Sequence, residues 1–243
     1  MPGKLNGKVA IVTGASAGIG RASALALAAE GATVIITARR QERLHALASE
    51  INAMNTQAYV VAGDANDEAT AKRCVETALN EAGTIDILLN NTGMGNYKNL
   101  ADTSLEEYDQ LMNTNMRSTF IFTRQVVPQM LLQKQGTILM ISSMAGLYGF
   151  ANQAVYCATK FAQVGFAQAL DKELRPGGIK VGVICPGGVK TEFAIGAGRT
   201  EESVAQSGML DATDVAGAVL LACTQAPGSR IIEIQMRTMS ESL

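Results

Sequence analysis

The sequence predicts a doubly wound α/β fold, in which a parallel sheet of about seven strands is covered by helices on both faces. Short apolar runs alternate with helical segments along nearly the whole chain. Strands that are separated by helices join through crossover connections, which makes the sheet parallel. No proline- or serine-rich linker and no internal repeat divides the 243 residues, so we expect a single domain over residues 1–243.

The strand assignments rest on short runs of apolar and β-branched residues. Residues 8–13 form an apolar run that stops at a glycine-rich loop, and residues 33–38 are rich in β-branched side chains. The predicted strands are 8–13, 33–38, 58–62, 85–90, 137–141, 179–184 and 231–236. Their number matches one doubly wound sheet.

Helical segments lie between these strands. Residues 19–30 are rich in Ala and Leu and end at Gly31, a residue that commonly terminates helices. The predicted helices are 19–30, 42–52, 68–82, about 104–132, 155–174 and 213–224. Pro128 lies inside the long fourth segment, and we expect a kink or break there because proline cannot donate the helical hydrogen bond.

Composition argues against several classes of protein. A net charge of −2 provides no electrostatic footprint for nucleic acid. No apolar run reaches the roughly 18 residues of a membrane span, and we see no secretory signal. The only histidine, His45, lies in a polar stretch and is expected on the surface, so we expect no metal site. The four cysteines form no Cys-x-x-Cys motif and indicate reduced thiols in a cytoplasmic protein.

The loop after the first strand, residues 13–20, reads Thr-Gly-Ala-Ser-Ala-Gly-Ile-Gly. Gly14 permits a tight turn, Gly18 lets the backbone approach a pyrophosphate, and Gly20 lets the helix pack closely on the sheet. The helix N-terminus then offers free N–H groups to the phosphates. The spacing differs from Gly-x-Gly-x-x-Gly, and by itself it is equally typical of an ordinary glycine-rich turn. Its position after the first strand favours a dinucleotide site of the Rossmann type.

The end of the second strand indicates which dinucleotide binds. NAD sites usually place an acid there to bond the ribose 2′-hydroxyl. This strand ends in Arg39 and Arg40, with no acid. Arginine suits a 2′-phosphate, so NADP is the expected cofactor and NAD is less favoured. The alternative is that both arginines are only solvated at a strand end.

Three further residues indicate proton-transfer chemistry. Tyr156 and Lys160 are four residues apart, so a phenol and an ammonium share one helix face. An ammonium about 5 Å from the phenol oxygen, at an effective dielectric of about 20, favours the phenolate by roughly 3 kcal/mol, or about two pKa units. Ser143, thirteen residues before Tyr156, is a candidate to hold the oxygen that receives the proton. Alone, Tyr-x-x-x-Lys is more often a surface pair; the adjoining cofactor loop favours catalysis.

Together these features resemble the short-chain dehydrogenase/reductase family, over about residues 6–236. The resemblance implies that Tyr156 is the general acid for carbonyl reduction and the base for alcohol oxidation. It implies that Lys160 lowers the pKa of Tyr156 and bonds the nicotinamide ribose, and that Ser143 steadies the substrate oxygen. Asn115 falls where the family has a catalytic asparagine that holds a proton-relaying water near Lys160.

The resemblance also implies the cofactor contacts. Residues 90–93, Asn-Asn-Thr-Gly, resemble the family's Asn-Asn-Ala-Gly, and residues 185–191 resemble its Pro-Gly segment beside the nicotinamide. Residues 64–65 fall where the family contacts adenine, although an Asp there also suits a turn. The predicted cofactor residues are Gly14, Ser16, Gly18, Ile19, Gly20, Arg39, Arg40, Asp64, Ala65, Asn91, Gly93, Tyr156, Lys160, Pro186, Gly187, Val189 and Thr191. The cofactor half is then about 1–135, and the catalytic and substrate half is about 136–243.

The expected function is hydride transfer between NADP(H) and a small carbonyl or alcohol substrate, as in a carbonyl reductase. The last strand lacks the Asp-Gly-Gly ending of many family members, which disfavours, without excluding, 3-ketoacyl-carrier-protein reduction. That activity needs a basic patch, to which Lys172 and Arg175 contribute few charges. A non-catalytic NADP-binding sensor or scaffold is an alternative of another class, but the catalytic positions are intact. An epimerase or dehydratase usually carries a larger C-terminal substrate domain.

The substrate side is less defined by the sequence. Residues 192–208 are expected to form a short mobile lid, with three glycines. The candidate pocket residues are Met94, Met144, Leu147, Tyr148, Phe150 and Phe193. They indicate a partly apolar carbonyl compound, although such residues are often plain core.

Self-association is also implied by the resemblance. Family members commonly pair through the two long helices that here span about 104–132 and 155–174. We therefore expect a homodimer or homotetramer with an isologous interface at these helices.

Overall fold

The computed structural model describes residues 3–240 and confirms the doubly wound α/β fold. Seven strands, all paired in parallel, form one sheet in the order β3-β2-β1-β4-β5-β6-β7. The strands are β1 (Val9–Thr13), β2 (Thr33–Ala38), β3 (Ala58–Ala62), β4 (Ile87–Asn90), β5 (Gly136–Ile141), β6 (Ile179–Pro186) and β7 (Glu233–Met236). The strand order reverses between β1 and β4, which places the ligand crevice of such a sheet beyond their carboxyl ends.

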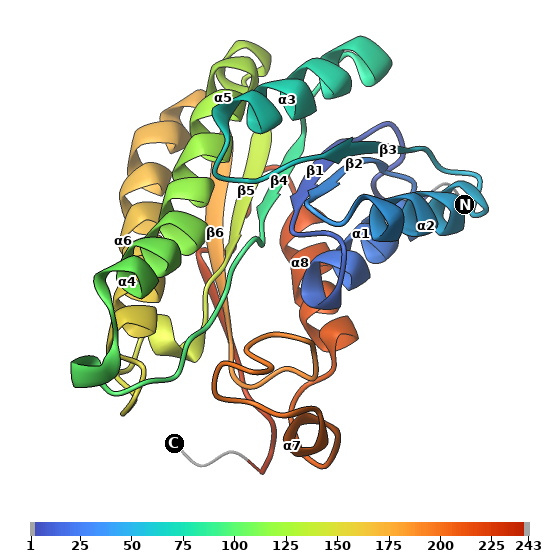
Figure 1. The fold of residues 1–243 in the computed structure, drawn as a ribbon. Coiled ribbons are helices and arrows are strands. Elements are labelled where there is room, and N and C mark those ends of the chain that lie inside the picture. The colour runs from blue at the N-terminus through green and yellow to red at the C-terminus, as the bar shows by residue number, and fades with distance from the viewer. Residues whose placement is uncertain (1–2, 241–243) are drawn as a thin grey trace.

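Helices cover both faces of this sheet (Figure 1). The helices are α1 (Gly18–Ala29), α2 (Gln41–Asn52), α3 (Glu68–Ala82), α4 (Leu105–Met112), α5 (Ser118–Gln133), α6 (Ala154–Leu174), α7 (Glu201–Ala205) and α8 (Ala212–Cys223). One core cluster packs α3, α5 and α6 on one face, and a second packs α1, α2 and α8 on the other. Neighbouring residues of β1 show the alternation, because Ile11 joins the first cluster while Ala10 and Val12 join the second.

The segment predicted as one long helix, 104–132, is divided at a different place from the one expected. A π-helical turn, η2 (Asn113–Arg117), separates α4 from α5. Pro128 lies within α5, so the predicted break at this residue is wrong. Pro128 is exposed, and on that side of the helix water can hydrate the carbonyl that loses its partner.

Some other boundaries also differ from those expected. Strands β4 and β7 each begin two residues later than predicted, at Ile87 and Glu233. The predicted lid, residues 192–208, contains the short helix α7, whose start is capped by reciprocal hydrogen bonds between Thr200 and Ser203. Across residues 3–240, no helix has the length and apolar character that a membrane span requires.

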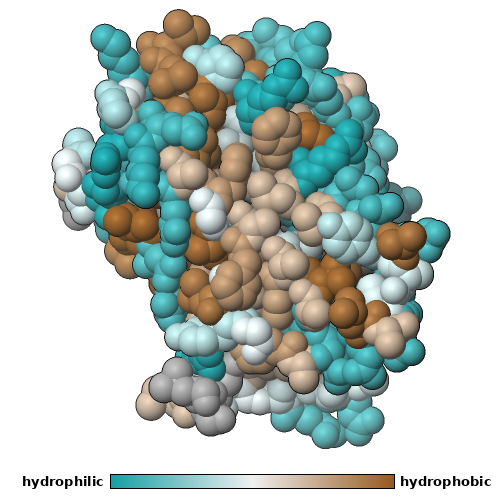
Figure 2. All heavy atoms as spheres, turned by 90° about the vertical axis from the view of Figure 1, so that its left-hand side faces the viewer, coloured by the Kyte–Doolittle hydropathy of each residue, from teal (hydrophilic) through white to brown (hydrophobic). Residues whose placement is uncertain are grey.

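Apolar side chains gather on the face formed by α4, α5 and α6 (Figure 2). The exposed large apolar side chains of these helices are Leu105, Tyr108, Phe120, Leu131, Leu132 and Phe161. On α6, exposed small residues flank Phe161 at helical spacing: Ala154 and Ala158 before it, and Gly165 after it. This face is therefore apolar, with small side chains at exposed positions of α6 on either side of Phe161.

Candidate active site

A cavity of about 890 Å³ opens at the carboxyl ends of the strands. All predicted cofactor residues except Gly20 line it, and so do Ser143 and most of the predicted substrate residues. Tyr148 does not line the cavity: it is exposed, with the Arg237 guanidinium 5.6 Å from its ring centroid. Leu147 also lies outside the lining and packs against the core. Within residues 3–240, no group of His, Cys, Asp and Glu side chains is placed to hold a metal ion.

The glycine-rich loop forms one wall of this cavity, and Asn91 fastens it. Gly14 and Gly18 have φ angles of +64° and +53°, in the left-handed region that favours glycine. The Asn91 amide donates hydrogen bonds to the carbonyls of Thr13 and Gly14, at 2.9 and 3.2 Å. A Cβ on Gly20 would lie 2.4 Å from both the Asn91 amide nitrogen and the Gly14 oxygen. Gly20 therefore serves the close packing of loop, helix and strand end, from behind the cavity wall.

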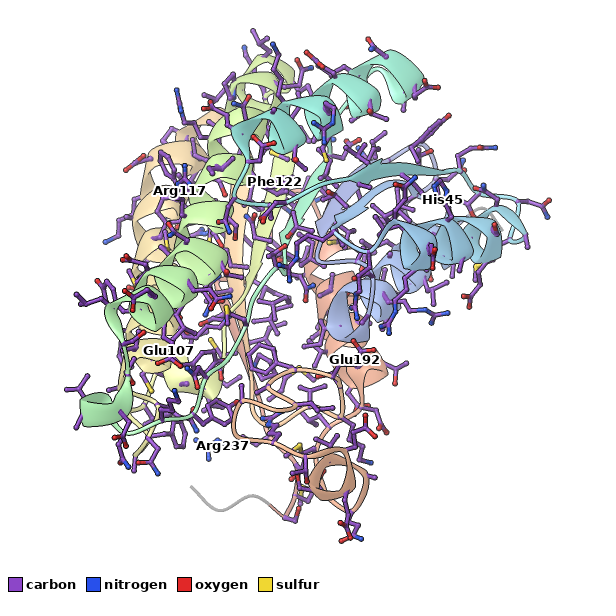
Figure 3. The ribbon with its side chains drawn as sticks, in the orientation of Figure 1. His45, Glu107, Arg117, Phe122, Glu192 and Arg237 are labelled. Atoms are coloured by element: carbon purple, nitrogen blue, oxygen red, sulfur yellow. The ribbon has the colours of Figure 1, made fainter. Side chains whose placement is uncertain are left out.

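A network of charged side chains closes the end of the cavity beside β2. The Arg40 guanidinium donates to Ser16 Oγ through Nε and Nη2, at 3.1 and 3.0 Å. Its Nη1 pairs with Glu192 Oε2 at 2.6 Å, and Arg43 from α2 pairs with the other oxygen of Glu192. Figure 3 shows Glu192 where the lid meets the helices α1 and α2. Both arginines hold the pKa of the Glu192 carboxyl below its ordinary value, so this carboxylate stays charged at neutral pH.

Sequence reasoning missed Arg43 and Glu192, because the two residues are 149 positions apart and the lid brings them together. Arg39 lines the cavity next to this network, and within the described chain it is not part of the bonded set. Asp64 lines the same end and also accepts a 2.9 Å hydrogen bond from the Asn66 backbone. Asp64 thus closes a turn and also lines the cavity, and its contact with adenine stays a prediction.

Tyr156 lies at the other end of the cavity, at 5% exposure. The rings of Tyr97 and Phe193 pack against its ring with centroids 5.9 and 5.8 Å away. Burial is the largest influence on the phenol and raises its pKa above the ordinary value; Ser143 and Arg199 act in the opposite direction but do not outweigh burial. The predicted net lowering of the Tyr156 pKa is therefore wrong for this structure, because burial holds the pKa of the phenol above its ordinary value.

The contacts of Lys160 help to explain why the Tyr156 pKa is not lowered as predicted. Its ammonium donates to the Ile141 carbonyl and to Gln163 Oε1, both at 2.9 Å, and lies 5.8 Å from the Tyr156 ring centroid. Lys160 is 3% exposed, and burial lowers its pKa to about 8. A buried ammonium that faces neutral oxygens loses its proton more readily than a solvated one.

Asn115 is joined to Lys160 through Gln163. The Asn115 side chain bonds the backbone N–H and carbonyl of Met94, at 2.8 and 2.9 Å, which holds the η2 turn against the segment after β4. The backbone carbonyl of Asn115 accepts a hydrogen bond from Gln163 Nε2 at 2.8 Å, while Gln163 Oε1 accepts one from the Lys160 ammonium. Gln163 was not predicted; its position three residues after Lys160 on the same helix face is the signal that would have found it.

Comparison with known proteins agrees with this geometry. A family model described as short chain dehydrogenase matches residues 8–202. An uncharacterized oxidoreductase of Staphylococcus epidermidis is 33% identical, over 96% of this chain and 98% of its own length. A 3-oxoacyl-[acyl-carrier-protein] reductase of Aquifex aeolicus is 38% identical over 78% of this chain and 77% of its own length. A metagenomic short-chain oxidoreductase, solved in complex with NADP, is 32% identical, with a TM-score of 0.84 over 98% of this chain and all of its own.

Proposed function

Because the chain belongs to the short-chain dehydrogenase family and is a NAD(P)-dependent dehydrogenase or reductase, we propose that it transfers a hydride between NADP(H) and a small carbonyl or alcohol compound. One observation carries the proposal. Ser143, Tyr156 and Lys160 line one cavity together with the glycine-rich loop and Arg40. A proton donor and a dinucleotide-sized cradle therefore share the same space.

The residues present fit a dinucleotide. Gly18 keeps a narrow space in the loop open, because a Cβ at this position would lie only 2.9 Å from the Thr191 side chain. The start of α1 follows directly and presents backbone N–H groups, which suits a pyrophosphate. We propose that residues 14–20 hold the pyrophosphate, that Asp64 and Ala65 border the adenine, and that residues 186–191 border the nicotinamide, as the family resemblance implies. The nicotinamide supplies the hydride when it is bound.

The protein's own part is to place a proton. Since burial raises the pKa of Tyr156, its phenol keeps its proton at neutral pH and is suited to donate it to a substrate oxygen. Ser143, which follows the end of β5 and lines the same cavity, is proposed to hold that oxygen by a hydrogen bond. The Lys160 ammonium, 5.8 Å from the Tyr156 ring centroid, is proposed to attract the anion left after the proton departs, an attraction that burial outweighs before the reaction. These roles favour carbonyl reduction as the working direction.

We propose that NADP(H) is preferred over NAD(H). Arg39 and Arg40 border the β2 end of the cavity and directly follow β2, at the position where NAD sites usually carry an acid for the ribose hydroxyl. Glu192 already engages Arg40, but its carboxylate and the arginines are about half exposed, and such ion pairs contribute little. A 2′-phosphate carries nearly two negative charges and is expected to displace Glu192.

Among the alternatives, 3-ketoacyl-carrier-protein reduction has the support of the Aquifex relative's name. That activity needs a basic surface for an acidic carrier, and among the described residues Arg175 and Arg230 are both paired with the Asp171 carboxylate, which disfavours it. A non-catalytic sensor is not favoured, since the proposed proton-transfer residues are together in one cavity.

We also propose the assembly, organisation and location of the protein. The exposed apolar face of α4, α5 and α6 supports a homodimer or homotetramer with α6 at an isologous interface. The single continuous sheet supports one functional domain over residues 1–243. The four free cysteines support a cytoplasmic location.

The proton-donor role is tested with Tyr156→Phe, which keeps the ring packing and removes the hydroxyl. We expect kcat for a confirmed carbonyl substrate to fall by roughly 10²–10⁴-fold, the usual range for general acid catalysis. The dissociation constant for NADPH, measured by fluorescence titration, should stay within about threefold. Tyr108→Phe, on the exposed face of α4, is the matched control. Turnover by Tyr156→Phe at near the original rate would refute the mechanism.

Cofactor preference is tested by titrating NADPH and NADH against three proteins. Arg40→Gln should weaken NADPH binding about tenfold or more, because a charge-assisted contact to phosphate is lost. Glu192→Gln should tighten NADPH binding several-fold, because Arg40 and Arg43 are then free. NADH binding should change little in either variant. Equal affinity of the unmodified protein for both cofactors would contradict the assignment.

Assembly is tested with Gly165→Gln on α6. A Cβ at Gly165 meets nothing within 4 Å, and replacing an exposed helical glycine favours the helix by several tenths of a kcal/mol. The variant should therefore fold normally but sediment as a smaller species, since a bulky side chain blocks close approach of two helices. Ala46→Gln, on the exposed side of α2, should leave the assembly intact. An unchanged sedimentation coefficient for Gly165→Gln would place the interface elsewhere.

A further inference from the structure

Arg199, on the lid, lines the catalytic end of the cavity, and the proton-transfer mechanism does not use it. Its guanidinium carbon lies 5.6 Å from the ring centroid of Tyr97 and 5.9 Å from that of Phe193. These are the two rings that pack against Tyr156. Arg199 is thus one aromatic side chain away from the proposed proton donor, and both rings help to fix its position.

The charge of Arg199 has no acidic partner within residues 3–240. Its hydrogen bonds go to neutral groups, the Val189 carbonyl at 3.5 Å and the side chain of Tyr97. The acids that line the cavity are Asp64 and Glu192; Asp64 is at the end of β3, and Glu192 is held by Arg40 and Arg43. The catalytic end of the cavity therefore presents positive charge that no acid of residues 3–240 neutralises.

We propose that the substrate is a small oxo acid or hydroxy acid whose carboxylate binds Arg199 while its carbonyl or hydroxyl oxygen lies at Ser143 and Tyr156. The planar guanidinium offers paired N–H donors that match the two oxygens of a carboxylate. The single ring between Arg199 and Tyr156 implies that a few carbon atoms separate the carboxylate from the reacting carbon. The inference rests on the proposed oxidoreductase function and names the substrate class for that site.

The reaction balances with the partners already proposed. In the reducing direction, the carbonyl carbon accepts a hydride from NADPH and the carbonyl oxygen accepts the Tyr156 proton, so that C=O becomes CH–OH. The carboxylate is unchanged and serves only for binding. A neutral acyl thioester offers no carboxylate to Arg199, so this arrangement also favours free acids over carrier-bound substrates.

The test compares 2-, 3- and 4-oxopentanoate with the methyl ester of each, in the presence of NADPH. The unmodified protein should give a higher kcat/KM for at least one acid than for its ester. Arg199→Gln should lower kcat/KM for that acid by about 10- to 100-fold, the range expected on losing a charged hydrogen bond. The kcat/KM for the matching ester should change by less than about threefold. Arg199→Lys should keep part of the preference, because its ammonium still attracts the carboxylate. Arg124→Gln, on the exposed side of α5, is the charge-matched control.

A binding measurement separates this inference from the oxidoreductase proposal. Calorimetric titration of the NADP-loaded protein with the same oxo acids should show binding that Arg199→Gln loses. Binding of an acid without turnover of any carbonyl compound would support the anion site and refute the proposed reaction. Three outcomes would each overturn the assignment of Arg199. The first is equal kcat/KM for every acid and its ester, and the second is an equal fall in kcat/KM for acid and ester in Arg199→Gln. The third is that no acid binds in the calorimetric titration.

Discussion

The buried ammonium of Lys160 is the constraint on which the site depends. It is 3% exposed and faces two neutral oxygens, the Ile141 carbonyl and Gln163 Oε1, and no acid of residues 3–240 pairs with it. Burying a cation in this way is costly unless each proton of the ammonium finds an acceptor. The oxygens that accept its hydrogen bonds belong to the end of β5 and to α6. Gln163 in turn donates a hydrogen bond to the backbone carbonyl of Asn115 at the η2 turn. Strand, helix and turn are therefore held in one arrangement around the cavity.

Charge is distributed so that the two ends of the cavity differ. At the β2 end, Arg40 and Arg43 share the carboxylate of Glu192, which an incoming phosphate can replace. At the Tyr156 end, Arg199 contacts neutral groups in the described chain: the rings of Tyr97 and Phe193, the Tyr97 hydroxyl and the Val189 carbonyl. Both ends are completed by residues of the lid, Glu192 and Arg199. The lid segment thus links the site proposed for the cofactor phosphate to the site proposed for the substrate.

Short sequence motifs predicted the parts of the site that are formed by residues close together in the chain. The glycine loop and the one-turn spacing of Tyr156 and Lys160 are properties of neighbouring residues, and the structure brings them into one cavity. What the sequence did not reveal depends on tertiary contacts. The direction of the Lys160 side chain is set by Gln163 and Ile141, and desolvation of the phenol outweighs the attraction that spacing alone suggested. Pro128 did not break its helix, because its exposed position lets water replace the missing hydrogen bond.

The most direct test of this account is the pH dependence of the free energy of unfolding, compared between the unmodified protein and Lys160→Met. Burial lowers the pKa of folded Lys160 to about 8, against about 10.4 in an unfolded chain. Between these values the unfolded state binds more protons, so the stability of the unmodified protein relative to Lys160→Met should rise with pH. The expected rise from pH 7 to 10.5 is on the order of 3 kcal/mol. A difference that stays flat over this range would mean that Lys160 titrates as a solvated lysine, and it would contradict the buried, acid-free ammonium at the centre of the site.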